Sequence, residues 1–150
     1  MQNDRDLPAG EAPDTLAGVR VFVAEDEPIL LMTLEDILCE LGCTVVGTAG
    51  RVTDSLAFVA SNAFDVAVLD GWLSDGIINP VVDALLARGI PFVVASGYDS
   101  CHFPESFSTA VFLKKPYSDE LLGQALLRSL ANKPSQSVAA CAENDMSGSR

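Results

Sequence analysis

Ionisable and hydroxyl side chains follow four apolar stretches of this sequence. Glu25 and Asp26 come after "VFVA", and Asp70 comes after "FDVAVL". Ser96 comes after "FVVA", and Lys115 stands between "VFLK" and a proline. Carboxylate oxygens are the ligands that Mg²⁺ prefers, whereas a lysine and a hydroxyl bind anionic oxygens. If these side chains converge, they suit the transfer of a phosphoryl group to a carboxylate nucleophile.

Such a convergence needs a cation. Three carboxylates ~5 Å apart repel one another by roughly 3 kcal/mol per pair at an effective dielectric constant near 20. A divalent cation removes that cost, and Lys115 and Ser96 would hold the oxygens of an incoming phosphoryl group. Each residue alone has an ordinary explanation, since acids favour the first turn of a helix and Asp favours turns. Their order at four strand ends favours a site.

The elements that would position these residues are short apolar strands alternating with helices. The predicted strands are residues 19–24, 43–49, 65–70, 90–96 and 110–114. The predicted helices are residues 28–41 with Leu31, Leu34, Leu38 and Leu41 on one face, 53–62 with Leu56, Val59 and Ala60 inward, 79–89 with Asn79 as the cap, and a last one with Ser118 as the cap.

This alternation predicts the α/β class, with a five-stranded parallel sheet and helices on both faces. Most of these strands read as nearly continuous apolar runs, as expected where both faces are covered. Binding sites in such sheets form at the carboxyl ends of the strands. Residues 97–109 contain Pro104 and lack an apolar stripe, so we expect a short or irregular fourth helix there.

Composition and charge limit the class of protein. The chain has 150 residues and a net charge of -12, which disfavours nucleic acids and anionic membranes as partners. Residues 18–131 are predicted to form one domain, residues 1–17 a flexible arm, and residues 132–150 a disordered tail too short for an output domain. The polar start and the lack of an apolar run of ~20 residues predict a cytoplasmic protein.

Four stretches together resemble the receiver domain of two-component response regulators. They are "VFVAEDEPILL", "DVAVLDGWLSDG", "VVASGY" and "VFLKKPYS", and the resemblance covers about residues 19–130. The resemblance implies the flavodoxin/CheY-like fold with strand order 2-1-3-4-5. It also implies a stand-alone, Mg²⁺-dependent response regulator that is no enzyme beyond its own phosphorylation and dephosphorylation. Its partners would be a sensor histidine kinase or phosphotransfer protein and a downstream protein target.

The resemblance also implies a role for each matching residue. Asp70 corresponds to the phosphoacceptor, and Ser96 and Lys115 to the catalytic residues that contact the phosphoryl group. The Lys115–Pro116 peptide bond is expected to be cis. The implied metal ligands are Glu25, Asp26, Asp70 and the main-chain carbonyl of Trp72, and the implied switch residues are Ser96, Phe112 and Tyr98.

Two departures from the family pattern keep alternatives open. Glu25 stands where Asp is commoner, and its longer side chain would reach the metal through water. Trp72 would shield an acyl phosphate on Asp70 from water. The alternatives are a pseudo-receiver that is never phosphorylated and a Mg²⁺-dependent hydrolase with an aspartate nucleophile. Trp72 disfavours the hydrolase because such enzymes carry a second Asp there, and "EDEP" would repel the phosphate of a flavodoxin-type cofactor.

Overall fold

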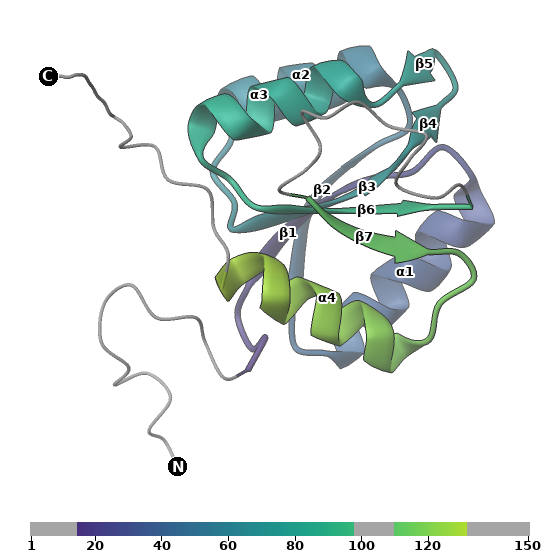
Figure 1. Cartoon of the computed structure of the whole chain (residues 1–150), viewed down its shortest axis with the longest axis vertical. Coiled ribbons are helices and arrows are strands. Elements are labelled where there is room, and N and C mark those ends of the chain that lie inside the picture. The colour runs from purple at the N-terminus through teal and green to yellow at the C-terminus, as the bar shows by residue number, and fades with distance from the viewer. Residues whose placement is uncertain (1–14, 98–109, 132–150) are drawn as a thin grey trace, which may run out of the picture.

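The computed structural model describes residues 15–97 and 110–131, in which five parallel strands form one sheet. The strand order is β2-β1-β3-β6-β7, and every neighbouring pair is parallel (Figure 1). This confirms the predicted fold class and the order 2-1-3-4-5, counting these five strands along the chain. Their bounds are β1 (Arg20–Ala24), β2 (Thr44–Ala49), β3 (Val66–Asp70), β6 (Phe92–Ser96) and β7 (Val111–Lys114).

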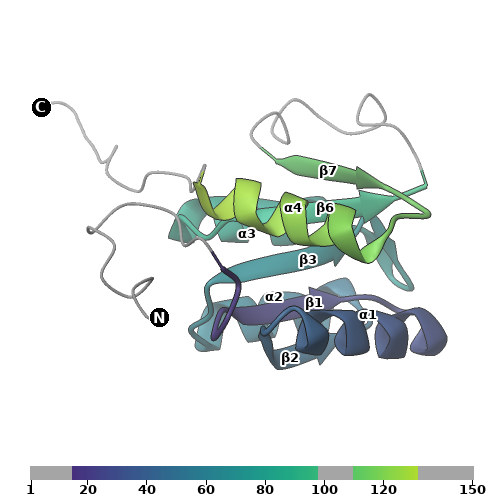
Figure 2. The same ribbon diagram turned by 90° about the horizontal axis from the view of Figure 1, so that it is seen from below.

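Four helices in the described residues cover both faces of the sheet. They are α1 (Pro28–Glu40), α2 (Val52–Ser61), α3 (Asn79–Arg88) and α4 (Asp119–Ala131). Figures 1 and 2 show α2 and α3 on one face and α1 and α4 on the other. Strand side chains alternate between the faces. Phe22 and Ala24 therefore pack in the layer with α2 and α3, whereas Val21 and Val23 pack in the layer with α1 and α4.

Two helix ends agree with their predicted signals, and one does not. Gly89 ends α3 in the left-handed conformation at φ 69°, and the Ser118 hydroxyl accepts the amide of Leu121 at 3.1 Å. The prediction of Asn79 as a cap is wrong, because Asn79 is the first residue of α3 and Ile78 occupies the cap position. The carbonyl of the buried Ile78 accepts the amide of Val82, so the helical hydrogen bonds begin one residue earlier.

The buried face of α2 also differs from the prediction. Val59 is buried as expected, but Ala60 is exposed, and Val52 and Ser55 are buried in its place. Positions 52, 55 and 59 lie on one face at helical spacing, and position 60 falls outside that face. The last turn of α2 packs closely on β1, because the Phe58 ring stacks on the Phe22 ring with centroids 4.6 Å apart. A side chain on Gly47 would collide with the Phe58 ring, so this strand position requires glycine.

The first described residues pack onto the domain. Leu16 is buried in the layer with α1 and α4, and the amide of Gly18 donates to the carbonyl of Gly42 at 2.8 Å. The rest of the predicted arm, the predicted tail and most of the predicted irregular helix lie outside the described residues. No helix among the described residues is long and apolar enough to cross a membrane.

A two-stranded hairpin, which sequence patterns did not predict, follows Asp70 directly. Its strands are β4 (Trp72–Leu73) and β5 (Gly76–Ile77), and they pair antiparallel. The amide of Ile78 donates to the carbonyl of Gly71 at 3.0 Å and closes its base. Two-residue strands are too short to show a hydrophobic period. Figure 1 shows the hairpin at one end of the α2–α3 layer.

Candidate functional site

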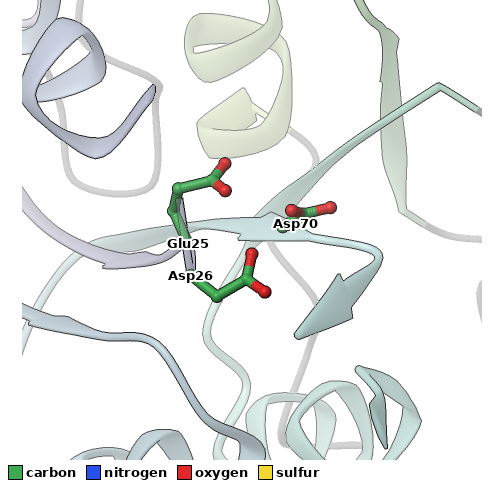
Figure 3. A group of neighbouring side chains, drawn as sticks. All are labelled: Glu25, Asp26 and Asp70. Carbon is green, nitrogen blue, oxygen red and sulfur yellow. The ribbon is translucent and has the colours of Figure 1, made fainter. Parts of the chain in front are cut away.

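Three carboxylates meet at the carboxyl edge of the sheet. Glu25 and Asp26 follow β1, and Asp70 ends the neighbouring parallel strand β3. One carboxylate oxygen from each residue lies within 4.8 Å of the others (Figure 3). Asp26 is exposed, Asp70 is half-buried and Glu25 is buried. The edge therefore gathers the three acids that were predicted to meet there.

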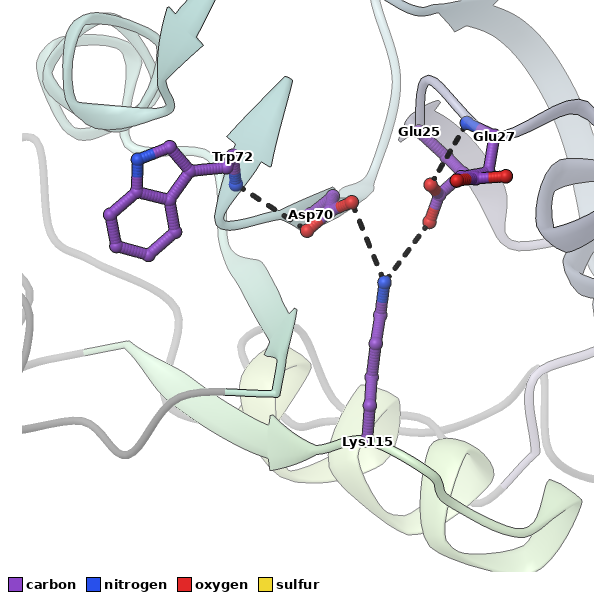
Figure 4. A network of polar contacts seen from close by, with 5 residues as sticks. All are labelled: Glu25, Glu27, Asp70, Trp72 and Lys115. Carbon is purple, nitrogen blue, oxygen red and sulfur yellow. Dashed lines mark hydrogen bonds and ion pairs between the residues drawn. The ribbon is translucent and has the colours of Figure 1, made fainter. Parts of the chain in front are cut away.

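Lys115 adds a cation to this acidic cluster. Its ammonium nitrogen lies 3.3 Å from Oε1 of Glu25 and 3.5 Å from Oδ2 of Asp70 (Figure 4). The amide of Lys115 donates to the carbonyl of Ser96 at 2.8 Å, and the Lys115–Pro116 peptide bond is cis. A single ammonium group thus bridges an acid after β1 and the acid that ends β3.

Glu25 is held in a buried position by its contacts with the Lys115 ammonium and the Glu27 amide. Its side chain is 4% exposed, and its Oε2 accepts the amide of Glu27 at 3.1 Å. Burial raises the pKa of the Glu25 carboxyl, and the negative charge of Asp70 adds to that effect. The Glu27 amide and the Lys115 ammonium act in the opposite direction, but burial prevails.

Ionised Glu25 should reduce the stability of the metal-free protein. Because its pKa is raised above the ordinary value of 4.5, the folded protein holds this proton more tightly than the unfolded chain. The stability from this group is fully present below pH 4.5 and is lost as the pH rises through the folded pKa. Urea unfolding in EDTA should therefore show the difference between Glu25→Gln and wild type moving in favour of the variant as the pH rises above 4.5.

The matched control for this experiment is Glu40→Gln, which neutralises an exposed carboxyl at the end of α1. It corrects for the general effect of removing one negative charge. A difference between Glu25→Gln and wild type that stays constant with pH, or follows the control, contradicts the prediction.

The main chain of Trp72, and not its ring, faces Asp70. The Trp72 amide donates to Oδ1 of Asp70 at 3.4 Å. Trp72 is 39% exposed, and Figure 4 shows the indole ring pointing away from the contact between Asp70 and Lys115. In this conformation the ring does not cover the Asp70 carboxylate from the side of the lysine.

The other predicted residues lie on the two strands beyond β3. Ser96 is 4% exposed and ends β6, one position beyond Ala95, which is in register with Asp70. Phe112 is half-buried on β7 in register with Val94, and it packs against the α2–α3 layer. Through Val94, Phe112 is level with Leu69, one position before Asp70. Tyr98 lies outside the described residues.

Sequence reasoning missed Tyr117. This half-buried residue lines a groove of about 410 Å³ with Glu25 and Lys115. Burial raises the pKa of the Tyr117 hydroxyl to about 12, and the charges of Glu25 and Asp70 add to the effect. Its position directly after the Lys-Pro pair was the available signal. The Glu27 amide, which binds Glu25, carried no signal in the sequence.

Solved structures show close likenesses to this chain, although no family model and no curated protein matches it. SdrG from Sphingomonas melonis is 38% identical, with a TM-score of 0.65 over 77% of this chain and 98% of SdrG. The BeF3-activated conformation of SdrG matches equally well, at 38% identity and a TM-score of 0.65 over 76% of this chain and 98% of SdrG. The PhyR response regulator REC domain from Erythrobacter litoralis is 25% identical, with a TM-score of 0.65 over 79% of this chain and 95% of that domain.

More distant structures share the fold. A receiver domain of a sensor histidine kinase from Pseudomonas aeruginosa, with a magnesium ion in its active site cleft, is 18% identical, with a TM-score of 0.64 over 76% of this chain and 98% of that domain. The anti-anti-sigma factor PhyR from Bartonella quintana is 19% identical, with a TM-score of 0.63 over 77% of this chain, which spans only 49% of PhyR. Because the SdrG match combines 38% identity with nearly the whole of that protein, and the PhyR REC domain has the same fold, this chain belongs to the receiver-domain family of response regulators.

Proposed function

We propose that this chain is a response-regulator receiver domain that accepts a phosphoryl group on Asp70 from a phosphohistidine donor, in a Mg²⁺-dependent reaction. The observation that carries the proposal is the Lys115 ammonium lying within 3.5 Å of both Glu25 and Asp70, inside a cluster of three carboxylates. Such an arrangement serves a reaction in which an anionic group approaches a carboxylate.

The donor atoms of the cluster fit Mg²⁺. Mg²⁺ takes oxygen ligands, keeps several waters and is usually bound through only one or two carboxylates. The ion would be held by Asp26, Asp70 and the main-chain carbonyl of Trp72. Glu25 would reach it through a water molecule. When bound, the ion would neutralise negative charge on the phosphoryl oxygens. The receiver domain from Pseudomonas aeruginosa with a magnesium ion in its cleft supports this assignment.

Transfer needs one bond to form and one to break. An oxygen of Asp70 forms a bond to phosphorus, while the bond between phosphorus and the imidazole nitrogen of the donor breaks. The imidazole leaves with the electron pair and takes a proton from solvent. Lys115 stabilises the negative charge of the transferred group from its position 3.5 Å from Oδ2 of Asp70. The BeF3-activated conformation of SdrG supports this step, because beryllium fluoride is an analogue of a phosphoryl group.

The output of this reaction is a change of conformation that a protein partner recognises. Ser96 would bind a phosphoryl oxygen, and Phe112, on the adjacent strand, would shift with it, together with Tyr98. We propose no catalysis beyond the phosphorylation and dephosphorylation of Asp70. The regulator would pass the group on, drain it from a kinase or bind a target.

The surface beside the site suits a protein donor. Ile29 and Met32 on α1 are 75% and 63% exposed, and Leu30 lines the groove that also contains Lys115 and Tyr117. Exposed apolar side chains at the rim of a site favour contact with another protein. The net charge of -12 disfavours a nucleic acid or an anionic membrane as the partner.

The test is intact mass spectrometry of the whole chain after incubation with acetyl phosphate, in Mg²⁺ or in EDTA. We expect a gain of about 80 Da, one phosphoryl group, in Mg²⁺ and none in EDTA. A phosphorylated histidine phosphotransfer protein serves as the second donor. No gain from either donor would favour the pseudo-receiver, an interaction module that is never phosphorylated. Continuous release of phosphate without a stable adduct would favour the hydrolase.

A further inference from the structure

The hairpin that follows Asp70 supplies the cap of a helix elsewhere in the chain. Helix α2 has Arg51 at its N-cap position, and Arg51 makes no side-chain cap hydrogen bond. The Asp75 carboxylate, at the tip of the β4–β5 hairpin, accepts the amides of Val52 and Thr53 in the first turn of α2. Both carboxylate oxygens are used, one for each amide. A residue 23 positions further along the chain thus satisfies amides that a helix leaves unpaired.

The charge on Asp75 strengthens this contact. Hydrogen bonds from the Val52 amide, and to a smaller extent from the Thr53 amide, lower the pKa of the Asp75 carboxyl against a partial desolvation. The carboxylate also lies at the positive end of the helix dipole, and Arg51 attracts it. The ionised form is therefore the one that binds the helix.

A second contact joins the same two segments. The Ser74 hydroxyl donates to the carbonyl of Gly50 at 3.2 Å. Gly50 in turn packs on the acidic cluster, because a Cβ placed there would lie 3.5 Å from Cα of Asp26. The tip of the hairpin is thus fastened to a segment that touches the main chain of one of the three acids.

The anchor at the tip adds to the attachment of the hairpin at its base. The hairpin consists of only two residue pairs, Trp72 with Ile77 and Leu73 with Gly76, which are at best marginally stable by themselves. The buried Leu73 and the bond from the Ile78 amide to the Gly71 carbonyl hold the base, and the contacts of Ser74 and Asp75 hold the tip. The first residue of the hairpin is Trp72, whose amide contacts Asp70 and whose ring is partly exposed. Freeing the tip would let the main chain at Trp72 move relative to the carboxylates.

We infer that Asp75 is a positioning residue for the phosphoryl-transfer site: by capping α2 it holds the β4–β5 hairpin, and with it the main chain of Trp72, against the acidic cluster. This inference rests on the proposed function, because it assigns the hairpin to the Mg²⁺ site of Asp70. The Asp75 carboxylate binds the first turn of α2, and it acts on the site through the hairpin.

The experiment compares Asp75→Ala with Asp54→Ala in the full chain. Asp54 is exposed in the first turn of α2, so its replacement removes the same charge at the same helix end without touching the hairpin. Mg²⁺ affinity is measured by calorimetry, and iodide quenching of Trp72, the only tryptophan, reports how the hairpin is held. We expect Asp75→Ala to weaken Mg²⁺ binding by about 10-fold and to increase quenching about twofold, and Asp54→Ala to change neither.

Asp75→Asn separates the contact from the charge, because the amide oxygen still accepts one of the two helix amides. We expect it to recover part of the lost Mg²⁺ affinity. Circular dichroism shows whether each variant folds; if Asp75→Ala does not, Asp75→Asn and Ser74→Ala replace it in the same comparison. Mg²⁺ binding by Asp75→Ala that equals that of Asp54→Ala overturns the inference, as does a wild type that binds no Mg²⁺.

Neither measurement uses a phosphodonor. A wild type that binds Mg²⁺ but gains no phosphoryl group therefore contradicts the proposed function alone. Unchanged Mg²⁺ affinity in Asp75→Ala, with normal phosphorylation of the wild type, contradicts the positioning role alone.

Discussion

Asp70→Asn should gain no phosphoryl group under conditions in which the wild type is fully phosphorylated. The substitution replaces one oxygen of the proposed nucleophile with an amide nitrogen and removes a charge that would attract Mg²⁺. The geometry around it should persist. The remaining amide oxygen can accept the amide of Trp72, and Lys115 keeps its contact with Glu25 at 3.3 Å.

The measurement is intact mass after incubation with acetyl phosphate and Mg²⁺. Asp36→Asn is the matched control, because it makes the same change at an exposed position on α1, and it should gain about 80 Da like the wild type. An adduct of the same mass on Asp70→Asn would show that another side chain is the phosphoacceptor. Loss of the adduct in both variants would show that the loss is not specific to Asp70.

Lys115→Met should slow phosphorylation by acetyl phosphate by about 100-fold without weakening Mg²⁺ binding. Methionine keeps much of the length of the side chain but removes the ammonium that stabilises the transferred group. The acidic cluster then carries one more net negative charge, so its attraction for a divalent cation does not fall. The rate of phosphorylation should therefore fall while the affinity for Mg²⁺ does not. A general loss of structure would lower both.

The chain offers an adjacent control for this test. Lys114→Met removes the same charge from an exposed position one residue earlier. It should leave the rate of phosphorylation, measured by mass over time at saturating Mg²⁺, within about twofold of wild type. Equal rates for Lys115→Met and the wild type would remove Lys115 from the proposed mechanism. Equally slow rates for both lysine variants would point to the overall charge of the segment.

The sequence alone determined the sheet and the meeting of the acids. Nearly continuous apolar residues in β3 and β6 show that both faces of these strands are covered, and strands alternating with helices lead to a parallel sheet. Because parallel strands end at one edge, Glu25 and Asp26 after β1 were expected at the same edge as Asp70 at the end of β3. The common edge is a consequence of local periodicity and chain direction, whereas the adjacency of β1 and β3 was implied by the resemblance to receiver domains.

Local patterns were less informative about where a helix begins and which of its positions are buried. Asn79 is a strong cap residue, but the carbonyl of Ile78 begins the hydrogen bonds of α3 one residue earlier. Ala60 is compatible with either side of a helix, and the packing of α2 on the sheet decided that positions 52, 55 and 59 are buried. Small apolar residues and cap residues have weak individual preferences, so tertiary packing overrides them.

Only the tertiary structure decided which groups bind one another across the chain. The contact of Lys115 with Glu25 spans 90 positions, and the cap that Asp75 provides for α2 spans 23. Neither pairing repeats with a helical or strand period, and each depends on where two backbones come to lie. The residue types that serve the chemistry are thus visible in the sequence, whereas the contacts that hold them in place follow from long-range packing, because such contacts depend on distances in space and not on spacing along the chain.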